Sequence, residues 1–190
     1  CKRLTVIKSN LNYFSLINLN MRVFIISLFF FCSLFSFSQG RKSVDNENGV
    51  LHFKLNSIIN LYEKKLEYDW IDEKGTEFYK YVGNDVEELF GYEVKSIHLI
   101  FVNDELFNIN VNFGSLSEEK NWELLDILRH KHDVPEIIYP NNHINFIAVW
   151  ETGKVIMQME EYSCWSPVFK CETNIFLTSK ALKKKLESDK

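Results

Sequence analysis

The sequence lacks the short motifs that mark the common classes of enzyme. It contains no H-E-x-x-H, no G-x-S-x-G, no phosphate-binding P-loop and no dinucleotide-binding fingerprint. Glycine is also scarce, with 7 residues in 190, and loops that bring the backbone close to a phosphate are usually rich in glycine. These absences argue against the enzymes that carry those motifs, and the sequence predicts no cofactor.

Basic residues are few beyond position 38. Residues 1–38 carry four of the 22 Lys and Arg residues and none of the 26 acidic ones, so residues 39–190 have a net charge of −8. Nucleic acids and anionic membrane surfaces are bound through clustered Lys and Arg. Neither is therefore expected as a partner of residues 39–190, and a protein or a small ligand is favoured. The oligomeric state is left open.

The longest apolar run, within Met21–Ser38, has the pattern of an export signal. Arg22 supplies a positive start, the fifteen residues Val23–Phe37 are uncharged and apolar, and serines stand at the −3 and −1 positions before Gln39. We expect cleavage between Ser38 and Gln39 and export to the periplasm or the cell exterior. Residues 1–20 begin with Cys1 and are interpreted as untranslated or as an extension of the positive start.

The alternative interpretation of residues 21–38 is a retained membrane anchor. A spanning helix needs about 20 apolar residues, and this run is shorter, so cleavage is favoured. If the leader is retained, the protein is anchored through residues 21–38. Cys32 lies inside the apolar run and does not end it, which does not fit a lipid attachment site.

The remaining 152 residues are enough for one domain with its own core. We expect a polar flexible segment at 39–49, a single α+β domain at 50–182 and a charged tail at 183–190. Hydrophobic periodicity and turn residues predict the elements of this domain. They are helices at 57–67, from about 117 to before Pro135, and within 179–190, and strands at 68–72, 76–82, 144–150, 155–162 and 171–178, with a hairpin over 92–113.

Short turns join most of these strands, and the helices are too few to serve as crossovers. The fold class expected is therefore α+β, a mainly antiparallel sheet of hairpins and a meander packed by two main helices. A helix followed by a meander occurs twice, which suggests a duplication of topology without a repeat of residues. The second main helix is predicted to begin with a capping box made by Ser115 and Glu118.

The register of the 92–113 hairpin determines where His98 points. A two-residue turn at Asn103-Asp104 would place His98 opposite Ile109 on the apolar side, whereas a three-residue loop would turn His98 toward water. We favour the three-residue loop, because it buries no histidine without a partner.

Aromatic residues concentrate in the strands predicted at 68–72 and 76–82. Half-buried sheets are rich in aromatic residues that pack across neighbouring strands. Core and cross-strand packing is therefore favoured for them over a ligand-binding aromatic platform. The aromatic residues concerned are Tyr68, Trp70, Phe78, Tyr79 and Tyr81.

Residues with metal-binding side chains cluster once, at His130, His132 and Asp133. These three residues are candidate ligands for zinc or a similar ion. Residues two apart on a helix point in divergent directions, however, and cations gather at helix C-termini because of the helix dipole. The dipole interpretation is favoured.

Cys164 and Cys171 flank a short loop, and in an exported chain we expect them to form a disulfide. The alternatives are two free thiols or a metal pair. The enclosed loop carries Trp165, Val168 and Phe169, which would form a pre-organised contact surface. The competing interpretation is that these three side chains fold back on the sheet as a lid, because exposed apolar patches are uncommon in monomers.

A strand at Trp150 follows the helix that ends before Pro135, and the hairpin contains the stretch F-V-N-D-E-L at Phe101–Leu106. This arrangement resembles small exported bacterial proteins of unknown function. The resemblance implies a helix-on-antiparallel-sheet domain, similar to β-lactamase-inhibitor-like and outer-membrane-assembly lipoprotein-like proteins. It implies no catalytic residue, and the chain lacks the lipid-attachment motif of the lipoprotein members.

Two functions follow from the sequence. The favoured one is a non-enzymatic binding or assembly module of the cell envelope, acting through a sheet face or through the loop with Trp165, Val168 and Phe169. The alternative is a metal-assisted hydrolase that uses His130, His132 and Asp133.

Overall fold

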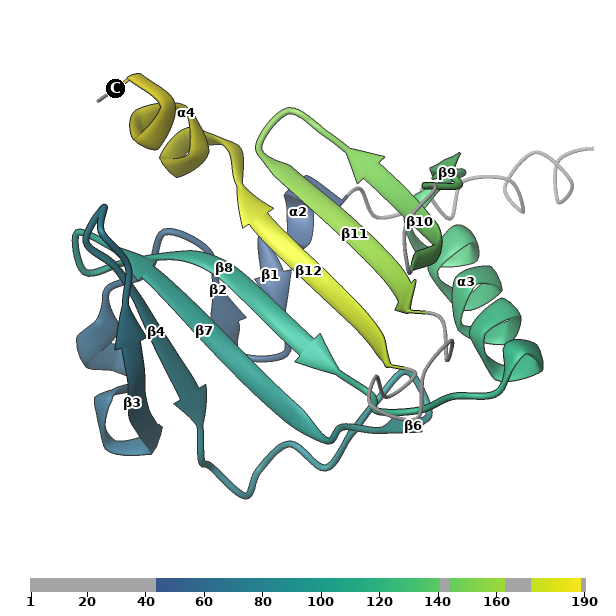
Figure 1. Cartoon of the computed structure of the whole chain (residues 1–190), viewed down its shortest axis with the longest axis horizontal. Helices are drawn as coiled ribbons and strands as arrows, with labels where there is room; N and C mark the ends of the chain where they lie inside the picture. The colour runs from purple at the N-terminus through teal and green to yellow at the C-terminus, as the bar shows by residue number, and fades with distance from the viewer. Residues whose placement is uncertain (1–43, 141–143, 163–171, 189–190) are drawn as a thin grey trace, which may run out of the picture. The chain divides into compact units, whose positions relative to one another are not determined.

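The computed structural model describes residues 44–140, 144–162 and 172–188, and its main feature is one antiparallel sheet of eight strands (Figure 1). The strand order is β3-β4-β7-β8-β12-β11-β10-β9. The strands are β3 Leu66–Ile71, β4 Thr76–Tyr81, β7 Ser96–Val102, β8 Glu105–Asn112, β9 Glu136–Ile138, β10 Ile144–Glu151, β11 Val155–Tyr162 and β12 Thr173–Ser179. The α+β class with a mainly antiparallel sheet is confirmed.

Smaller elements surround this sheet. Two short hairpins, β1 with β2 and β5 with β6, form separate two-stranded sheets. No helix in the described part of the chain is long and apolar enough to cross a membrane. The bounds are β1 Gly49–Val50, β2 Phe53–Lys54, β5 Glu88–Leu89, β6 Tyr92–Glu93, α2 Val44–Glu47, α3 Glu118–His132, α4 Lys180–Ser188, and the 3-10 helices η1 Ile59–Leu61 and η2 Glu63–Lys65.

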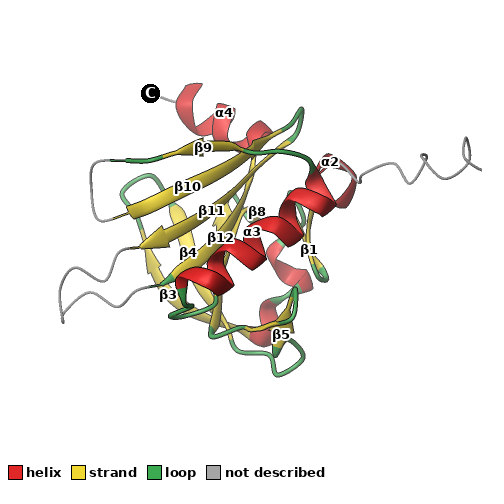
Figure 2. Cartoon of the chain, turned by 90° about the vertical axis from the view of Figure 1, so that its right-hand side faces the viewer, coloured by secondary structure: helices red, strands yellow, loops and turns green. Residues whose placement is uncertain are grey.

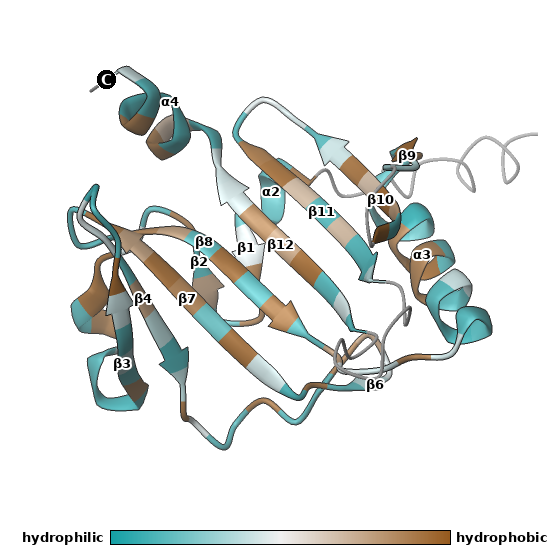
Figure 3. Cartoon of the chain, in the orientation of Figure 1, coloured by the Kyte–Doolittle hydropathy of each residue, from teal (hydrophilic) through white to brown (hydrophobic). Residues whose placement is uncertain are grey.

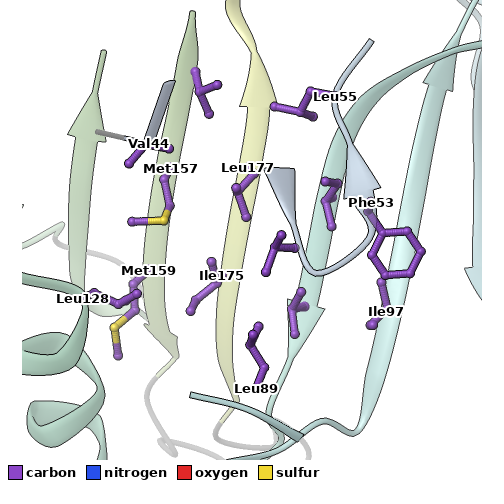
Figure 4. Packing of buried hydrophobic residues seen from close by; sticks show 14 of the residues in the cluster. Val44, Phe53, Leu55, Leu89, Ile97, Leu128, Met157, Met159, Ile175 and Leu177 are labelled. Atoms are coloured by element: carbon purple, nitrogen blue, oxygen red, sulfur yellow. The ribbon is translucent and has the colours of Figure 1, made fainter. Parts of the chain in front are cut away.

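The core lies on the face of the sheet that α3 covers (Figure 2). Alternate residues of the strands point to this face, so hydropathy alternates along them (Figure 3). Met157 and Met159 of β11 and Ile175 and Leu177 of β12 are buried there, and Leu128 of α3 packs near them (Figure 4). The alternation of buried and less buried residues along these strands therefore positions the core.

The α3 helix is confirmed, although its first turn differs from the prediction. The side chain of Ser117, not Ser115, accepts the capping hydrogen bond, from the backbone N–H of Lys120 at 3.3 Å. Leu124, Leu125 and Leu128 are fully buried. The helix ends at His132, and Asp133 follows with a φ of 82°.

The helix predicted at 57–67 is absent, and two 3-10 turns take its place. The cause is a competing set of backbone hydrogen bonds with the start of β8. Asn56 N–H donates to the Leu106 carbonyl at 2.8 Å, and Leu106 N–H donates to the Ser57 carbonyl at 2.8 Å. Ile59 N–H donates to the Asp104 carbonyl at 2.9 Å. The Ser57 carbonyl is therefore not free to accept an i to i−4 bond. The residues after it form i to i−3 bonds, in which Leu61 N–H donates to the Ile58 carbonyl at 3.2 Å and Tyr62 N–H to the Ile59 carbonyl at 2.8 Å.

Residues 44–49, which belong to the segment 39–49 that we expect to be flexible, pack against the domain. Val44 is buried, and the Asp45 carboxylate accepts hydrogen bonds from the Lys154 N–H at 2.8 Å and the Val155 N–H at 3.1 Å. Lys131 forms an ion pair with Glu47 at 2.9 Å. The ordered domain therefore begins before position 50. It also continues past position 182, because residues 183–188 belong to α4.

The β7–β8 hairpin closes with the two-residue turn Asn103-Asp104, so the favoured three-residue loop is wrong. Val102 pairs with Glu105, and the turn residues have φ values of 49° and 62°. Positive φ at both positions is the geometry of a tight hairpin turn, which Asn and Asp tolerate.

A bulge at Phe107 nevertheless gives His98 the expected orientation. Phe101 pairs with Leu106 and Ile100 pairs with Asn108, so Phe107 is the extra residue. The shift places His98 opposite Asn110, on the face away from the core, where it is half-buried.

Pairing of β8 with β12 joins two four-stranded meanders into one sheet, from Asn112 with Asn174 to Asn108 with Thr178. One meander contains β3, β4, β7 and β8, and the other contains β9, β10, β11 and β12. The predicted repeat of a helix before each meander holds only for α3 and the second meander, since the first helix is absent.

Candidate functional site: the β3 edge surface

Strand β3 forms one end of the eight-stranded sheet, so one side of its backbone has no neighbouring strand in the described chain. Five of its six residues are exposed, although the sequence L-E-Y-D-W-I is rich in apolar side chains. Tyr68, Trp70 and Ile71 are 55%, 48% and 50% exposed. Edge strands with exposed apolar residues are templates for pairing with another chain. We call Glu67–Ile71 the β3 edge surface.

Hydrogen bonds at the two ends of β3 show which backbone groups face outward. Val82 N–H donates to the Lys65 carbonyl at 2.9 Å, and Asp72 N–H donates to the Thr76 carbonyl at 2.9 Å. Hydrogen-bonded and non-hydrogen-bonded pairs alternate in an antiparallel ladder. Counting from each end, with the register shift between Tyr68 and Trp70, Tyr68 and Ile71 direct their N–H and C=O groups away from β4. These are the groups that an added strand would pair with.

Aromatic pairs join β3 to β4 on both faces of the sheet. Trp70 stacks on Phe78 with ring centroids 4.0 Å apart and planes 8° apart, on the face away from the core. Tyr68 meets Tyr79 edge-on at 5.5 Å, on the core side. The predicted cross-strand packing is thus found, and Tyr81 is a buried core residue. The sequence did not indicate that Tyr68 and Trp70 would remain half-exposed at an edge.

Further apolar side chains are exposed just before and after these strands. Among the described residues, half of the large hydrophobic side chains with high exposure belong to the segment 58–82. Concentration of such side chains is typical of an interaction surface, whereas single exposed ones are ordinary. Besides the three residues of the β3 edge surface, the segment exposes Ile58, Leu61 and Val82.

The β3 edge surface is also acidic. Glu67 and Asp69 are exposed on the strand, Glu73 follows in the turn, and Glu77 lies on β4 opposite Ile71. Lys80, opposite Glu67, is the one basic residue in the β3–β4 ladder. Asp69 is the bulge residue, since Tyr68 pairs with Tyr79 and Trp70 with Phe78. Charges and bulges are devices that protect an edge from nonspecific pairing.

A polar cluster fixes the chain directly before β3. The Tyr81 hydroxyl donates to Asp85 Oδ1 at 2.6 Å, and Lys65 Nζ donates to Asp85 Oδ2 at 2.9 Å. The ring Nε2 of His52 lies 3.4 Å from the Tyr81 hydroxyl. The hydrogen bond from Tyr81, followed by that from Lys65, lowers the pKa of Asp85 from 3.8 to about 2. The same Asp85 hydrogen bond raises the pKa of Lys65.

The candidate metal ligands at the end of α3 have separate environments. His130 is exposed, with Nδ1 2.7 Å from the Asp126 carbonyl oxygen, whereas His132 is buried. Asp133 is exposed, and its backbone carbonyl accepts a hydrogen bond from Trp150 Nε1 at 2.9 Å. No group of three or more His, Cys, Asp or Glu residues suited to a metal ion occurs in the described parts of the chain.

The cationic side chains in the last turn of α3 contact neighbouring acidic and aromatic side chains. Lys131, besides its ion pair with Glu47, lies with its Nζ 5.0 Å from the ring centroid of Phe90. Arg129 lies 3.3 Å from Asp126 on the same helix. These contacts are local packing and charge pairs, such as solvent-facing helix ends commonly make.

Several sequence predictions concern residues outside the described ranges. They are the candidate loop residues Trp165, Val168 and Phe169, the cysteines Cys164 and Cys171, the leader at 21–38 and the preceding residues 1–20. For these the expectations stay predictions.

The described fold is an α+β domain whose single large sheet is open at β3. Comparisons of the chain with family models, with curated proteins and with solved structures found no match. The resemblance to small exported bacterial proteins, like the function, stays a prediction.

Proposed function

We propose that this chain is a non-enzymatic binding module of the cell envelope or cell exterior that captures an extended protein segment as an added strand at β3. The observation that carries the proposal is the exposure of Tyr68, Trp70 and Ile71 on a strand whose outer side has no neighbouring strand among the described residues. Strand addition gains affinity from backbone hydrogen bonds and specificity from the alternating side chains. The outward N–H and C=O groups of Tyr68 and Ile71 would form the backbone hydrogen bonds that give affinity. The aromatic pairs would contact the side chains of the added strand and give specificity.

The negative charge of the β3 edge surface determines which kind of partner segment can bind there. Glu67 and Asp69 would lie near the side chains of an added strand, and like charges placed opposite each other across a ladder are destabilising. Two copies of this chain paired through β3 would bring acidic residues together. A segment that alternates basic and apolar residues instead pairs its cations with Glu67 and Asp69. The partner proposed is therefore an extended basic and apolar segment of another protein.

The two faces of the edge would hold the alternating residues. Tyr68 and Ile71 lie on the core side, where Tyr68 meets the Tyr79 ring, so they favour apolar partners. Glu67 lies on the opposite side with Lys80 across from it, and favours basic partners. Charge steers encounter and discriminates between partners more than it adds affinity.

The direct test is titration with a nine-residue synthetic peptide that alternates lysine and valine, monitored by NMR and calorimetry. We expect binding, with the largest shifts at β3. The same peptide with N-methyl groups on its pairing edge keeps its side chains and charge but cannot donate to β3, so we expect no binding. A glutamate–valine peptide should also fail. Equal binding of the N-methylated peptide, or no binding of the parent peptide, would refute the proposal.

A matched pair of variants locates the binding edge. Ile71→Pro removes an outward N–H while leaving the internal ladder intact, and proline is tolerated on an edge strand in that position. We expect at least a tenfold loss of peptide affinity. Ile138→Pro places the same substitution on β9, the opposite edge, and should leave the affinity unchanged. Circular dichroism verifies that both variants fold.

A further inference from the structure

A second surface, remote in sequence from β3, has the opposite charge. A cavity of about 580 Å³ lies between the first turns of α4 and the turn that joins β10 to β11. Four lysines line it, Lys154 from the turn and Lys180, Lys183 and Lys184 from α4, against two acids, Glu151 and Glu187. The volume falls within the range of small-ligand sites. This excess of cations stands on a chain whose net charge is −4.

Only one of the four ammonium groups is neutralised by an ion pair in the described chain. Lys180 Nζ lies 2.7 Å from Glu151 Oε1 and donates to the Thr152 carbonyl at 2.9 Å. The hydrogen bond from Lys180 is the main cause of the lowered pKa of Glu151, and Lys183 contributes at longer range. Lys154, Lys183 and Lys184 form no ion pair among the described residues, which leaves three cations around one cavity.

The helix that holds these lysines is fixed in place. Leu182 is buried, and its N–H donates to the Ser179 hydroxyl, which in turn donates to Asn56 Oδ1 at 2.6 Å. The first turn of α4 contains no acidic residue, although anionic side chains are the ones that a helix dipole stabilises there. Lys183 and Lys184 are exposed and form no ion pair among the described residues, so their ammonium groups are open to a ligand in the cavity.

We infer that this cavity binds an anion bearing phosphate groups. Lysine recognises phosphate as a compact point charge with three donors, and the three ammonium groups without an ion pair in the described ranges match a ligand with more than one negative charge. Asn56 and Ser179, which are hydrogen-bonded to each other, form the wall beside the lysines. The phosphate can belong to a soluble molecule or to a lipid headgroup, and the chemistry of recognition is the same for both.

The probe for this site is pyrophosphate, titrated into the whole protein by calorimetry at low and at 150 mM salt. We expect binding that weakens with salt, since ionic contacts are screened. The double variant Lys183→Gln/Lys184→Gln should lose at least tenfold in affinity. Lys185→Gln is the matched control, because Lys185 lies on the same helix but pairs with Glu105 at 3.5 Å, and it should bind as the parent does.

Vesicles separate the two sources of phosphate. Sedimentation with phosphatidylcholine vesicles containing phosphatidic acid, dependent on Lys183 and Lys184, supports a lipid headgroup, whereas pyrophosphate binding without sedimentation supports a soluble ligand. An equal loss of affinity in Lys185→Gln, or no pyrophosphate binding by the parent protein, would overturn the inference. The site is separate from β3, so either proposal can fail while the other holds.

Discussion

The two edges of the eight-stranded sheet differ in how they end. Strand β9 has three residues and is bracketed by Pro135 and Pro140, whereas β3 has six residues and no proline. Proline cannot donate to a ladder, and a short strand offers few groups to pair with. The β9 edge therefore offers few backbone groups to an added strand. The β3 edge is guarded by charge and a bulge, which exclude some strands and admit others.

This difference teaches how an edge can be both protected and functional. The shortness of β9 and its flanking prolines disfavour pairing with any strand, whatever the sequence of that strand. Acidic residues such as Glu67 and Asp69 act selectively, because they repel acidic strands and attract basic ones. Exposed Trp70, stacked on half-buried Phe78, then provides apolar contact to a strand that has paired with β3. Four changes should alter peptide binding or stability at one edge and not at the other, and they follow in decreasing order of expected effect.

Charge reversal should change the selectivity of β3 most. In Glu67→Lys/Asp69→Lys we expect affinity for the lysine–valine peptide to fall by roughly tenfold, since two cross-strand pairs change sign at about 0.2–1 kcal/mol each. Affinity for the glutamate–valine peptide should rise. Calorimetric titration of both peptides measures this. An unchanged order of affinities would show that charge does not select the partner.

Removal of the exposed indole should weaken β3 more than truncation weakens β9. Trp70→Ala loses the stack on Phe78, and aromatic pairs contribute about 0.5–1.5 kcal/mol beyond area burial. Ile138→Ala, on β9, removes a side chain of similar exposure without such a stack, so we expect less than about 0.5 kcal/mol. Urea unfolding measures the loss in free energy of unfolding for each variant. Equal losses would mean that the aromatic stack does not stabilise β3.

Acid should loosen the attachment of β3. Because the pKa of Asp85 is lowered from 3.8 to about 2 in the folded protein, its contribution to stability is full above pH 3.8. That contribution is lost as the pH falls through about 2. Tyr81→Phe removes the largest cause of the shift, and should reduce the loss of stability between pH 4 and pH 2. Thermal unfolding across this range tests it, and identical pH profiles for both proteins would contradict the assignment.

Removing a proline from the β9 edge should have the smallest effect. Pro135→Ala restores one backbone donor beside β9, but the strand stays three residues long. We expect the affinity for the lysine–valine peptide to change by less than about twofold, equivalent to roughly 0.4 kcal/mol. A new peptide-binding site at β9, seen by NMR, would show that proline alone closes this edge.

The sequence predicts the local part of this fold well. Strict alternation in β8 and the turns near Gly75 and Gly153 predicted strands within a few residues of their bounds. The capping residue of α3 was missed by two positions. Ser115 has Glu118 three residues on and fits the capping-box pattern, whereas Ser117, which makes the cap, has Lys120 in that position.

The misses share a non-local cause. Residues 57–67 have helical periodicity, yet the backbone of Ser57–Ile59 pairs with Asp104 and the start of β8, which the sequence pattern does not show. A two-residue turn alone implies that His98 points toward the core, and the bulge at Phe107 turns it to the opposite face of the sheet. The candidate site depends on strand order as well. The β3 strand becomes an edge because β8 pairs with β12, and the exposure of Trp70 follows from that pairing rather than from residues near Trp70.

Amide hydrogen exchange on β3 and β9, with and without the lysine–valine peptide, tests the central claim most directly. We predict that the peptide slows exchange at Tyr68 and Ile71, whose N–H groups point outward, and leaves Glu136–Ile138 unchanged. Protection confined to other regions, or equal protection at both edges, would contradict strand addition at β3.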